Sequence, residues 1–466
     1  EYKMYINGEW VDAENKKTFE SLNPENNEPW AVVPEASAKD VDKAVQSAQK
    51  AFEGEWPKLF PKERAKYLKA IANQLRENAE LLGKIETIDT GKLFRETKTQ
   101  ANYIAEYYDY FAGLADKVEG TVLPIDKPDM QVITTRIPIG VIAAIIPWNS
   151  QMLLTAVKLA PALAMGNTVV IKSSELAPAT MFEFAKLIEK TGIPKGVVNI
   201  ITGFGNPCGK ALTSHPLVER IAFTGGPETA RHIIKNSAEN LSQVSLELGG
   251  KSPVAVFEDA DQENALNGIT AGIFGASGQS CIAGSRLYLQ NKIYDNFLNK
   301  LIERATKIKL GGPMDPDTQM GPLASFKQLE IIEKTIDEVK QLDIPFGYKA
   351  NLWKTEEPVP VHKFASPTDE IGANPAEVMG TRDDYTGEKF MEFSKKMKEK
   401  PTRRQDAPKV YQLNGLFTYN TKRFLKFKNQ YPPKGLPIEI PPETGIMIDT
   451  ELEFKIVEMM LKQKLI

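Results

Sequence analysis

Hydrophobic and polar residues recur with two different periods along the first part of the chain. In "VDKAVQSAQKAF" (41–52), apolar residues return every three or four positions, and this spacing predicts an amphipathic helix. Charged sequence of helical character continues to about residue 115. Over 118–140, β-branched residues alternate around prolines, which predicts a protruding hairpin.

Short β-branched runs then alternate with longer segments of helical character. The runs are "VIAAII" (141–146), "TVVIK" (168–172), "VVNIIT" (197–202) and "RIAFT" (220–224). This rhythm predicts an α/β fold with a Rossmann-like, doubly wound parallel sheet. Ligands of such sheets bind at the carboxyl ends of the strands, where this chain reads "PWN", "KSSE", "GFGNPCG" and "TGG".

Composition places the chain among soluble globular proteins of two or three domains, because 42% of its 466 residues are hydrophobic and 26% are charged. A net charge of −3 gives no reason to expect binding to nucleic acid or to a membrane. Two cysteines form no disulfide framework and favour a reducing, cytoplasmic location. Three scattered histidines predict no metal site.

The pattern changes near residue 342. Prolines without a clear period mark 342–394 as a linker or irregular joint. Basic residues outnumber acidic ones over 391–430, and we interpret this excess as a solvated basic face, since aromatic residues for base stacking are not interleaved with it.

One cysteine stands in the Gly- and Ser-rich segment "GASGQSC" (275–281). A nucleophilic thiol needs exposure, room for a tetrahedral adduct and nearby amides, and small neighbours of Cys281 provide that room. The alternative is that Cys281 is a buried, small apolar residue. Cys208, in "GNPCG", has no comparable support and is interpreted as a packing residue.

Two further polar residues suit chemistry at a carbonyl carbon. Glu247 precedes two glycines in "LELGGK", where little bulk surrounds the carboxylate, so it is a candidate general base. Its alternative is an ordinary surface glutamate. Asn149, in "PWNS", follows a predicted strand and is a candidate oxyanion donor, or the cap of the next helix.

A dinucleotide site is indicated by two strand-end segments. Gly203, Gly205 and Gly209 form G-x-G-x-x-x-G, one residue longer than the usual fingerprint. In "IKSSE", Lys172 and Glu175 supply a donor and an acceptor for ribose hydroxyls. A carboxylate there disfavours a 2′-phosphate, which favours NAD over NADP.

Residues 1 to about 341 resemble the NAD(P)-dependent aldehyde dehydrogenases through "YINGEW", "PIGVIAAIIPWN", "NTVVIKSSE", "LELGGKSP", "GQSCIAGSR" and "MGPL". The resemblance implies oxidation of a small aldehyde to a carboxylic acid through a thiohemiacetal and a thioester on Cys281. Asn149 and the Cys281 amide would hold the oxyanion, and Glu247 would activate water. The implied cofactor-binding residues are Trp148, Lys172, Glu175, Gly205, Gly209, Phe223, Gly225, Leu248 and Gly249.

The resemblance also implies a division of the chain into parts. Residues 1–117 and 141–246 would form the NAD-binding domain, 118–140 an oligomerisation hairpin, and 247–341 a truncated α/β catalytic domain. Residues 395–466 resemble the C-terminal part of acylneuraminate cytidylyltransferases through "RRQDAPKVYQLNG" and "GIMIDTELEF", which predicts a small C-terminal α/β fragment.

Three alternatives to aldehyde oxidation stay open at this point. The chain could bind NAD without turnover, could be a chimera of two enzyme fragments, or could relate to synthesis of a CMP-nonulosonic acid. The hairpin is compatible with a homo-oligomer, while the assembly state and the identity of the aldehyde are left open by the sequence.

Overall fold

A computed structural model describes residues 1–341 of the chain. The predicted joint at 342–394 and the cytidylyltransferase-like fragment at 395–466 lie outside the described residues. Contacts between Cα atoms divide the chain into two compact units. The larger unit contains residues 1–250, 256–285 and 293–338, and the smaller unit includes 251–255 and 286–292.

The chain begins with two antiparallel strand pairs. Strands β1 (Met4–Ile6) and β2 (Glu9–Val11) meet at Asn7 and Gly8, whose φ angles of 56° and 70° suit a tight hairpin turn. Strand β3 (Thr18–Asn23) pairs with β4 (Glu28–Pro34) in a separate sheet.

Helix α1 (Ala38–Glu53) begins at a capping box, in which the Ser37 and Asp40 side chains each accept from the other's backbone N–H. Its buried residues, among them Val41 and Val45, follow the helical period that the sequence shows, which confirms the predicted amphipathic helix. A 3₁₀ turn over Trp56–Lys58 and three helices follow: α2 (Pro61–Glu77), α3 (Ala79–Thr90) and α4 (Phe94–Leu114).

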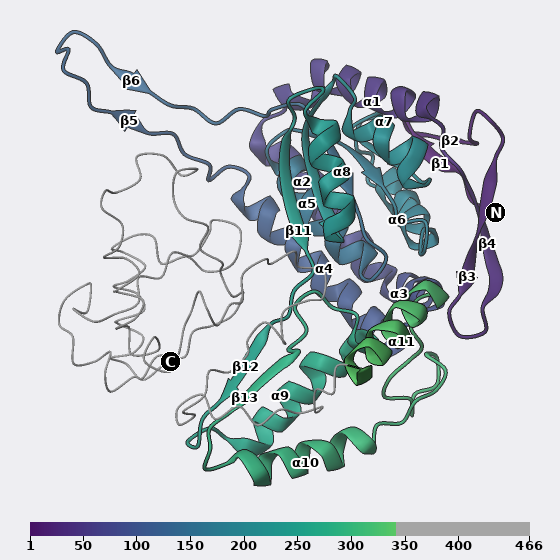
Figure 1. The fold of residues 1–466 in the computed structure, drawn as a ribbon. Coiled ribbons are helices and arrows are strands. Elements are labelled where there is room, and N and C mark those ends of the chain that lie inside the picture. Colours follow the sequence, from purple (N-terminus) through teal and green to yellow (C-terminus); the bar gives the residue numbers. More distant parts are fainter. Residues whose placement is uncertain (342–466) are drawn as a thin grey trace, which may run out of the picture. The chain divides into compact units, whose positions relative to one another are not determined.

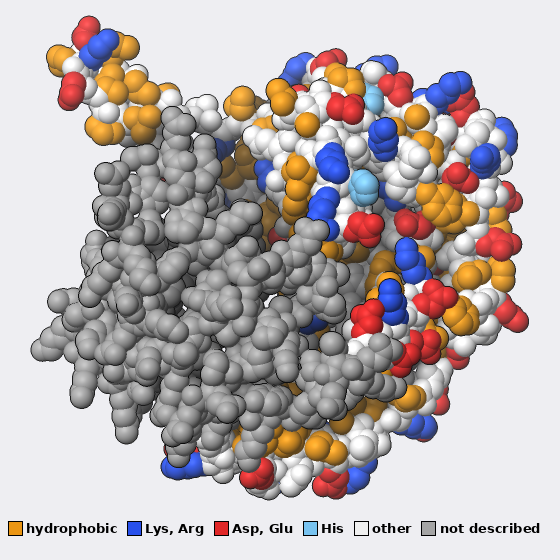
Figure 2. Space-filling model, viewed as in Figure 1, with side chains coloured by type: hydrophobic (Ala, Val, Ile, Leu, Met, Phe, Trp, Pro, Cys, Tyr) orange, Lys and Arg blue, Asp and Glu red, His pale blue; other side chains and the backbone are white. Residues whose placement is uncertain are grey.

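Strands β5 (Val122–Leu123) and β6 (Val132–Ile133) pair antiparallel within residues 118–140. Figure 1 shows this ribbon standing away from the helices, and Figure 2 shows hydrophobic side chains gathered over its outer part. Val122 and Ile133 are each 62% exposed. A role of this ribbon in oligomerisation stays a prediction.

The central sheet has seven strands in the order β11-β10-β7-β8-β9-β1-β2. Its five parallel members are β7 (Val141–Ile145), β8 (Thr168–Lys172), β9 (Val198–Ile201), β10 (Val218–Gly225) and β11 (Gln243–Leu248). The helices between them are α5 (Gln151–Ala164), α6 (Ala179–Lys190), α7 (Lys210–Thr213) and α8 (Pro227–Ser237). The predicted α/β class with a parallel-dominated sheet is confirmed.

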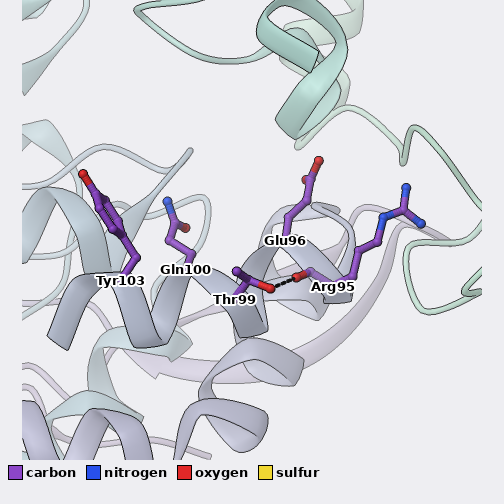
Figure 3. A pocket seen from close by; sticks show the side chains of 5 residues that line it. All are labelled: Arg95, Glu96, Thr99, Gln100 and Tyr103. Atoms are coloured by element: carbon purple, nitrogen blue, oxygen red, sulfur yellow. Dashed lines mark hydrogen bonds between the residues drawn. The ribbon is translucent and has the colours of Figure 1, made fainter. Parts of the chain in front are cut away.

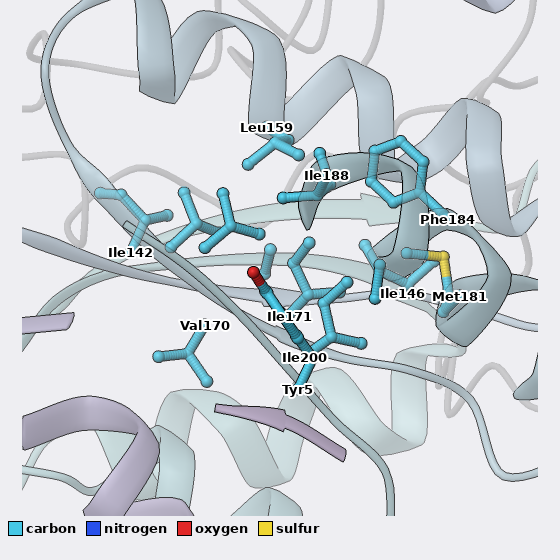
Figure 4. Packing of buried hydrophobic residues seen from close by; sticks show 14 of the residues in the cluster. Tyr5, Ile142, Ile146, Leu159, Val170, Ile171, Met181, Phe184, Ile188 and Ile200 are labelled. Atoms are coloured by element: carbon cyan, nitrogen blue, oxygen red, sulfur yellow. The ribbon is translucent and has the colours of Figure 1, made fainter. Parts of the chain in front are cut away.

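Every residue of β7, β8 and β9 is buried, so the centre of the sheet is covered on both faces. Figure 4 shows Leu159 of α5 and Phe184 of α6 in the same hydrophobic cluster as the strand residues Ile171 and Ile200. The core therefore fixes where each parallel strand ends, and those ends carry the predicted site residues.

The rest of the larger unit contains α9 (Gln262–Phe274), the short turn η3 (Gly275–Gly278), α10 (Tyr294–Thr306) and most of α11 (Phe326–Gln341). Strands β12 (Pro253–Val256) and β13 (Arg286–Leu289) form their own two-stranded sheet. The division into cofactor and catalytic domains stays a prediction. Within residues 1–341, no helix is both long and apolar enough to cross a membrane.

Candidate active site

The carboxyl ends of the parallel strands bring predicted residues to one edge of the sheet. Ile145, at the end of β7, lies opposite Lys172 of β8 and Phe223 of β10. On the other side of β10, Gly225 lies opposite Leu248 at the end of β11. Strand register thus places residues from across the sequence along a single edge, as the parallel fold predicts.

Asn149 joins this edge to the cysteine-bearing turn. Its Nδ2 donates a hydrogen bond to the Gln279 carbonyl at 2.8 Å, across 130 positions of sequence. Cys281 follows Gln279 by two residues. Asn149 directs its amide to this turn and does not cap α5, whose first turn begins after Ser150. One of its two amide hydrogens remains for another acceptor.

The turn before Cys281 has an uncommon backbone. Ala276, Ser277 and Gly278 have φ angles of 51°, 57° and 73°, all in the left-handed region. This conformation is costly for residues other than glycine, so the surrounding contacts must hold it. The Ser277 hydroxyl donates to the Gly321 carbonyl at 3.0 Å, and the Gln279 side-chain oxygen accepts from Ala324 N at 2.9 Å. These contacts come from residues far along the chain.

Cys281 is half-buried, whereas Cys208 is fully buried. The structure therefore does not support the alternative in which Cys281 is a packing residue of the core. It supports the packing interpretation of Cys208, whose burial raises its pKa to about 11.

A buried lysine of α5 links the two predicted catalytic residues. Lys158 is 8% exposed, and its ammonium donates to Thr224 Oγ1 at 2.5 Å and to the Leu154 carbonyl at 3.4 Å. Burial lowers the pKa of Lys158 to about 8, while the charges of Glu247 and Cys281 act in the opposite direction. Glu247 and Cys281 therefore lie within electrostatic reach of one ammonium group.

Sequence reasoning did not identify Lys158. A signal was present, because Lys158 is the only charged residue of "QMLLTAVKLAPALA", the helix α5 (Gln151–Ala164). A single lysine in an otherwise apolar helix either reaches solvent along its stem or has a partner in the interior. Only the tertiary structure, in which Lys158 donates to Thr224 of β10, distinguishes these cases.

Glu247 is exposed at the end of β11, beside the glycines of "LELGGK". A Cβ added at Gly249 would meet no atom within 4 Å, so nothing packs against this glycine. Exposure alone is compatible with an ordinary surface glutamate. The interaction with Lys158 is the observation that favours a role in the site.

Lys172 and Glu175 form the predicted donor–acceptor pair at the end of β8. The buried Lys172 ammonium lies 3.5 Å from Glu175 Oε2 and donates to the Ser173 carbonyl at 3.1 Å. A Cβ at Gly209 would lie 3.8 Å from Lys172 Cε, so the glycine segment passes directly beside the lysine stem. Lys172 thus contacts residues from two strand ends, Glu175 after β8 and Gly209 after β9.

The backbone at Gly225 leaves no room for a side chain. A Cβ there would lie 2.4 Å from the ring of Phe223, which is itself buried. At Gly205, by contrast, a Cβ would meet no atom within 4 Å. Trp148 is half-buried and Leu248 is 37% exposed, and the cofactor roles of all these residues stay predictions.

A cavity of about 250 Å³ lies beside the cysteine turn. It is lined by Lys92, Glu96, Gln100, Asn149, Ser150, Leu153, Ala276, Gln279, Ser280 and Ile282. Ser280 and Ile282 are the two sequence neighbours of Cys281. A hollow of about 530 Å³ on α4 shares Glu96 and Gln100 with this cavity (Figure 3). The sequence around these α4 residues contains no recognisable motif, so only the tertiary structure shows that they line the cavity.

Comparison with known proteins gives consistent matches. A family model described as the aldehyde dehydrogenase family matches residues 10–357. The (Z)-2-((N-methylformamido)methylene)-5-hydroxybutyrolactone dehydrogenase of Acinetobacter baylyi is 54% identical over 337 residues, covering 72% of this chain and 69% of that protein. Betaine aldehyde dehydrogenase of Bacillus subtilis is 42% identical over 335 residues, covering 72% and 68%.

Solved structures agree with these sequence matches. The crystal structure of betaine aldehyde dehydrogenase from Staphylococcus aureus in complex with NAD+ aligns with a TM-score of 0.72 and 41% identity. The alignment covers 75% of this chain and 69% of that one. The described fold and the sequence motifs therefore have the same relatives.

Proposed function

Because the chain belongs to the aldehyde dehydrogenase family, we propose that it oxidises a small aldehyde to a carboxylic acid, with NAD as the cofactor. One observation carries the assignment of the site. Lys158 interacts with both Glu247 and Cys281, while Asn149 is hydrogen-bonded to the turn that carries Cys281. These interactions support a site that combines a nucleophile, a carboxylate and an amide donor, which acyl chemistry requires.

In the first half-reaction, Cys281 Sγ attacks the carbonyl carbon and forms the C–S bond of a thiohemiacetal. The oxygen gains negative charge as the C=O π bond breaks. The remaining Asn149 amide hydrogen and the Cys281 backbone N–H are the groups that would donate to this oxygen. When bound, NAD supplies the acceptor for the hydride that leaves this carbon, and Cys281 then holds a thioester.

In the second half-reaction, Glu247 takes a proton from water as that water attacks the thioester carbon. The C–S bond breaks, the Cys281 thiolate leaves, and a carboxylic acid is released. Lys158 is placed to stabilise negative charge on the thiolate and on the carboxylate, because its ammonium interacts with both.

The residues at the sheet edge fit a dinucleotide. Lys172 and Glu175 would hold the adenosine ribose, and the Glu175 carboxylate favours NAD over NADP. Gly209 lies beside the Lys172 side chain, and Gly225 makes room for Phe223. Trp148, Gly205, Leu248 and Gly249 would complete the lining of this site.

Two measurements on the full chain test the proposal. Incubation with propionaldehyde and NAD should form NADH, followed by absorbance at 340 nm. Iodoacetamide should label Cys281 before Cys208, followed by peptide mass spectrometry. Absence of NADH together with unselective labelling would contradict the proposal. Calorimetric NAD binding without NADH formation would instead identify a protein that binds the cofactor and turns nothing over.

We further propose that the β5–β6 ribbon contributes to a homo-oligomer. The supporting observation is its exposed apolar surface, which includes Ile137 at 73% exposure. Light scattering after size exclusion should give a mass above 51.8 kDa for the chain. Replacement of Val122 and Ile133 by Ser should lower that mass, and an unchanged mass would contradict the role of the ribbon.

A further inference from the structure

The cavity beside Cys281 is organised by a buried lysine. Lys92 is 4% exposed, and its ammonium lies 3.0 Å from Glu86 Oε1. The same ammonium donates to Gln100 Oε1 at 2.9 Å and to Ser150 Oγ at 3.2 Å. A lysine ammonium has three hydrogens, so these three acceptors use all of them.

This arrangement fixes which groups face the cavity. Since Gln100 Oε1 is turned to Lys92, its Nε2 is turned away, and Figure 3 shows that nitrogen at the end directed away from α4. Ser150 Oγ accepts from Lys92, so its own hydrogen is free to be donated. Among residues 1–341, neither the Gln100 Nε2 hydrogens nor the Ser150 hydroxyl hydrogen has an assigned acceptor.

Glu96 adds an acceptor to the same cavity. It precedes Gln100 by one helical turn on α4, and its Oε1 accepts weakly from Ala276 N at 3.4 Å. Its Oε2 is buried and has no hydrogen-bond partner in the described part of the chain. Buried polar atoms without a partner are rare and costly, so a rotation of the Glu96 side chain that turns this oxygen toward a ligand donor in the cavity would stabilise it.

The volume limits the size of the ligand. A volume of about 250 Å³ is below the range of roughly 300–1,000 Å³ that pockets for drug-sized ligands offer. Leu153, Ala276 and Ile282 give part of the lining an apolar character. The cavity therefore suits a chain of a few heavy atoms with one polar group.

The charge within the cavity further restricts which polar group the ligand carries. Lys92 and Glu86 neutralise one another, so the Glu96 carboxylate leaves an excess of negative charge. A carboxylate on the substrate would be repelled by Glu96. An alkyl group would leave the donors of Gln100 and Ser150 unpaired. An ammonium group, primary or quaternary, is attracted by Glu96 but has no lone pair to accept from these donors. A hydroxyl group both donates and accepts.

We propose, on the basis of the function inferred above, that this cavity selects small hydroxyaldehydes. The substrate hydroxyl accepts from Gln100 Nε2 or Ser150 Oγ and donates to Glu96 Oε2 once that side chain turns into the cavity, while the aldehyde carbon faces Cys281. Lys92 is a positioning residue, because it acts by orienting Gln100 and Ser150 and does not itself touch the substrate.

Lactaldehyde and propionaldehyde provide the test, because they share three carbons and differ by one hydroxyl. With the full chain and NAD, kcat/KM for lactaldehyde should exceed that for propionaldehyde by at least about tenfold. Gln100→Leu and Glu96→Gln should each lower this ratio about fivefold. The ratio comes from one preparation, so it does not depend on the fraction of folded protein.

Thr99→Ala is the matched control. Thr99 lies on the same helix and lines only the outer hollow, where its hydroxyl donates to the Arg95 carbonyl at 2.7 Å. The substrate ratio should be unchanged in this variant. A ratio near one in the unaltered protein, or faster turnover of succinate semialdehyde than of lactaldehyde, would overturn the proposal.

Protection of Cys281 separates this proposal from the enzymatic one. Either aldehyde can form a thiohemiacetal and so block alkylation by iodoacetamide, without any hydride transfer. If no NADH forms but lactaldehyde protects Cys281 at about tenfold lower concentration, and Gln100→Leu removes the difference, the selectivity stands and the oxidation does not. Equal protection, or no protection by either aldehyde, overturns the selectivity.

Discussion

The two cysteines lie in regions that differ in every property relevant to thiol chemistry. Cys208 follows β9 in the interior. Its Cβ packs so closely on Gly203 that a Cβ added to that glycine would lie only 2.9 Å away. Cys281 follows a left-handed turn, is half-buried, and has both sequence neighbours on a cavity wall. The surroundings of Cys208 suit packing, and those of Cys281 leave its thiol accessible to a substrate.

The comparison shows that a nearby cation is not enough to activate a thiol. Burial raises the pKa of Cys208 to about 11, although Lys172 lowers it in part. At pH 8 about one molecule in a thousand then carries the Cys208 thiolate. Reactivity at Cys281 depends on exposure and on room around the sulfur, which the small residues of its turn provide.

Replacement of each cysteine should give the largest difference in activity between the two regions. Cys281→Ser should lower kcat by more than about a thousandfold, because a serine hydroxyl is a far weaker nucleophile. Cys208→Ala should retain kcat and lose about 1 kcal/mol of stability through a small cavity. NADH formation and thermal unfolding measure the two effects. Equal loss of kcat in both variants would contradict the distinction.

Removal of the carboxylate near Cys281 should have the next largest effect. Glu247→Gln keeps the shape of the side chain but cannot take a proton from water, so kcat should fall about a hundredfold or more. A rapid burst of about one NADH per chain should precede the slow phase, since the thioester still forms. Glu239→Gln, at another exposed glutamate, is the control. A proportional loss of burst and steady rate would argue against this role.

Lys158, which interacts with Cys281, predicts a pH dependence of kcat. Its pKa of about 8 means that the ammonium is present below pH 8 and lost above it. We expect the contribution of Lys158 to kcat in the unaltered chain to fall as the pH rises through about 8, because the ammonium is lost. Lys158→Met should remove this fall and lower kcat about tenfold at pH 7. A pH profile from 6 to 10 measures this, and an unaltered inflection in the variant would contradict it.

The same lysine predicts a pH dependence of stability. Between about pH 8 and the ordinary lysine value of 10.5, the folded chain binds fewer protons than the unfolded chain. The contribution of Lys158 to the free energy of unfolding should therefore rise with pH across this range. The difference between the unaltered chain and Lys158→Met, measured by denaturant unfolding at pH 7.5 and 10, should change in that direction.

Lys172, at the buried end of β8, should give the smallest effect on chemistry. Lys172→Met should raise KM for NAD about tenfold and leave kcat nearly unchanged, because it removes a charged donor to the cofactor and none to the aldehyde. The split between KM and kcat is the measurement. A fall in kcat with unchanged KM would place Lys172 in the chemistry.

Local patterns in the sequence were sufficient for four of the seven strands of the central sheet and for part of the site, but they did not identify β11, β1 or β2. The β-branched runs of β7 to β10 and the helical period of α1 depend on residues close in sequence, so they could be predicted. The turn before Cys281 could not be predicted from propensity. Ala276 and Ser277 adopt left-handed backbone there, and contacts from Gly321 and Ala324 hold it.

The sequence by itself determined the four central strands β7 to β10, the glycine- and polar-rich segments that follow them, and the candidates for nucleophile, base and oxyanion donor. Only the tertiary structure decided that Asn149 contacts Gln279, that Lys158 reaches Glu247 and Cys281, and that Lys92 orients Gln100 and Ser150. The reason is physical. Periodicity and turn chemistry are encoded by neighbours in sequence, whereas the environment of a buried ammonium is set by segments that meet only when the whole core packs.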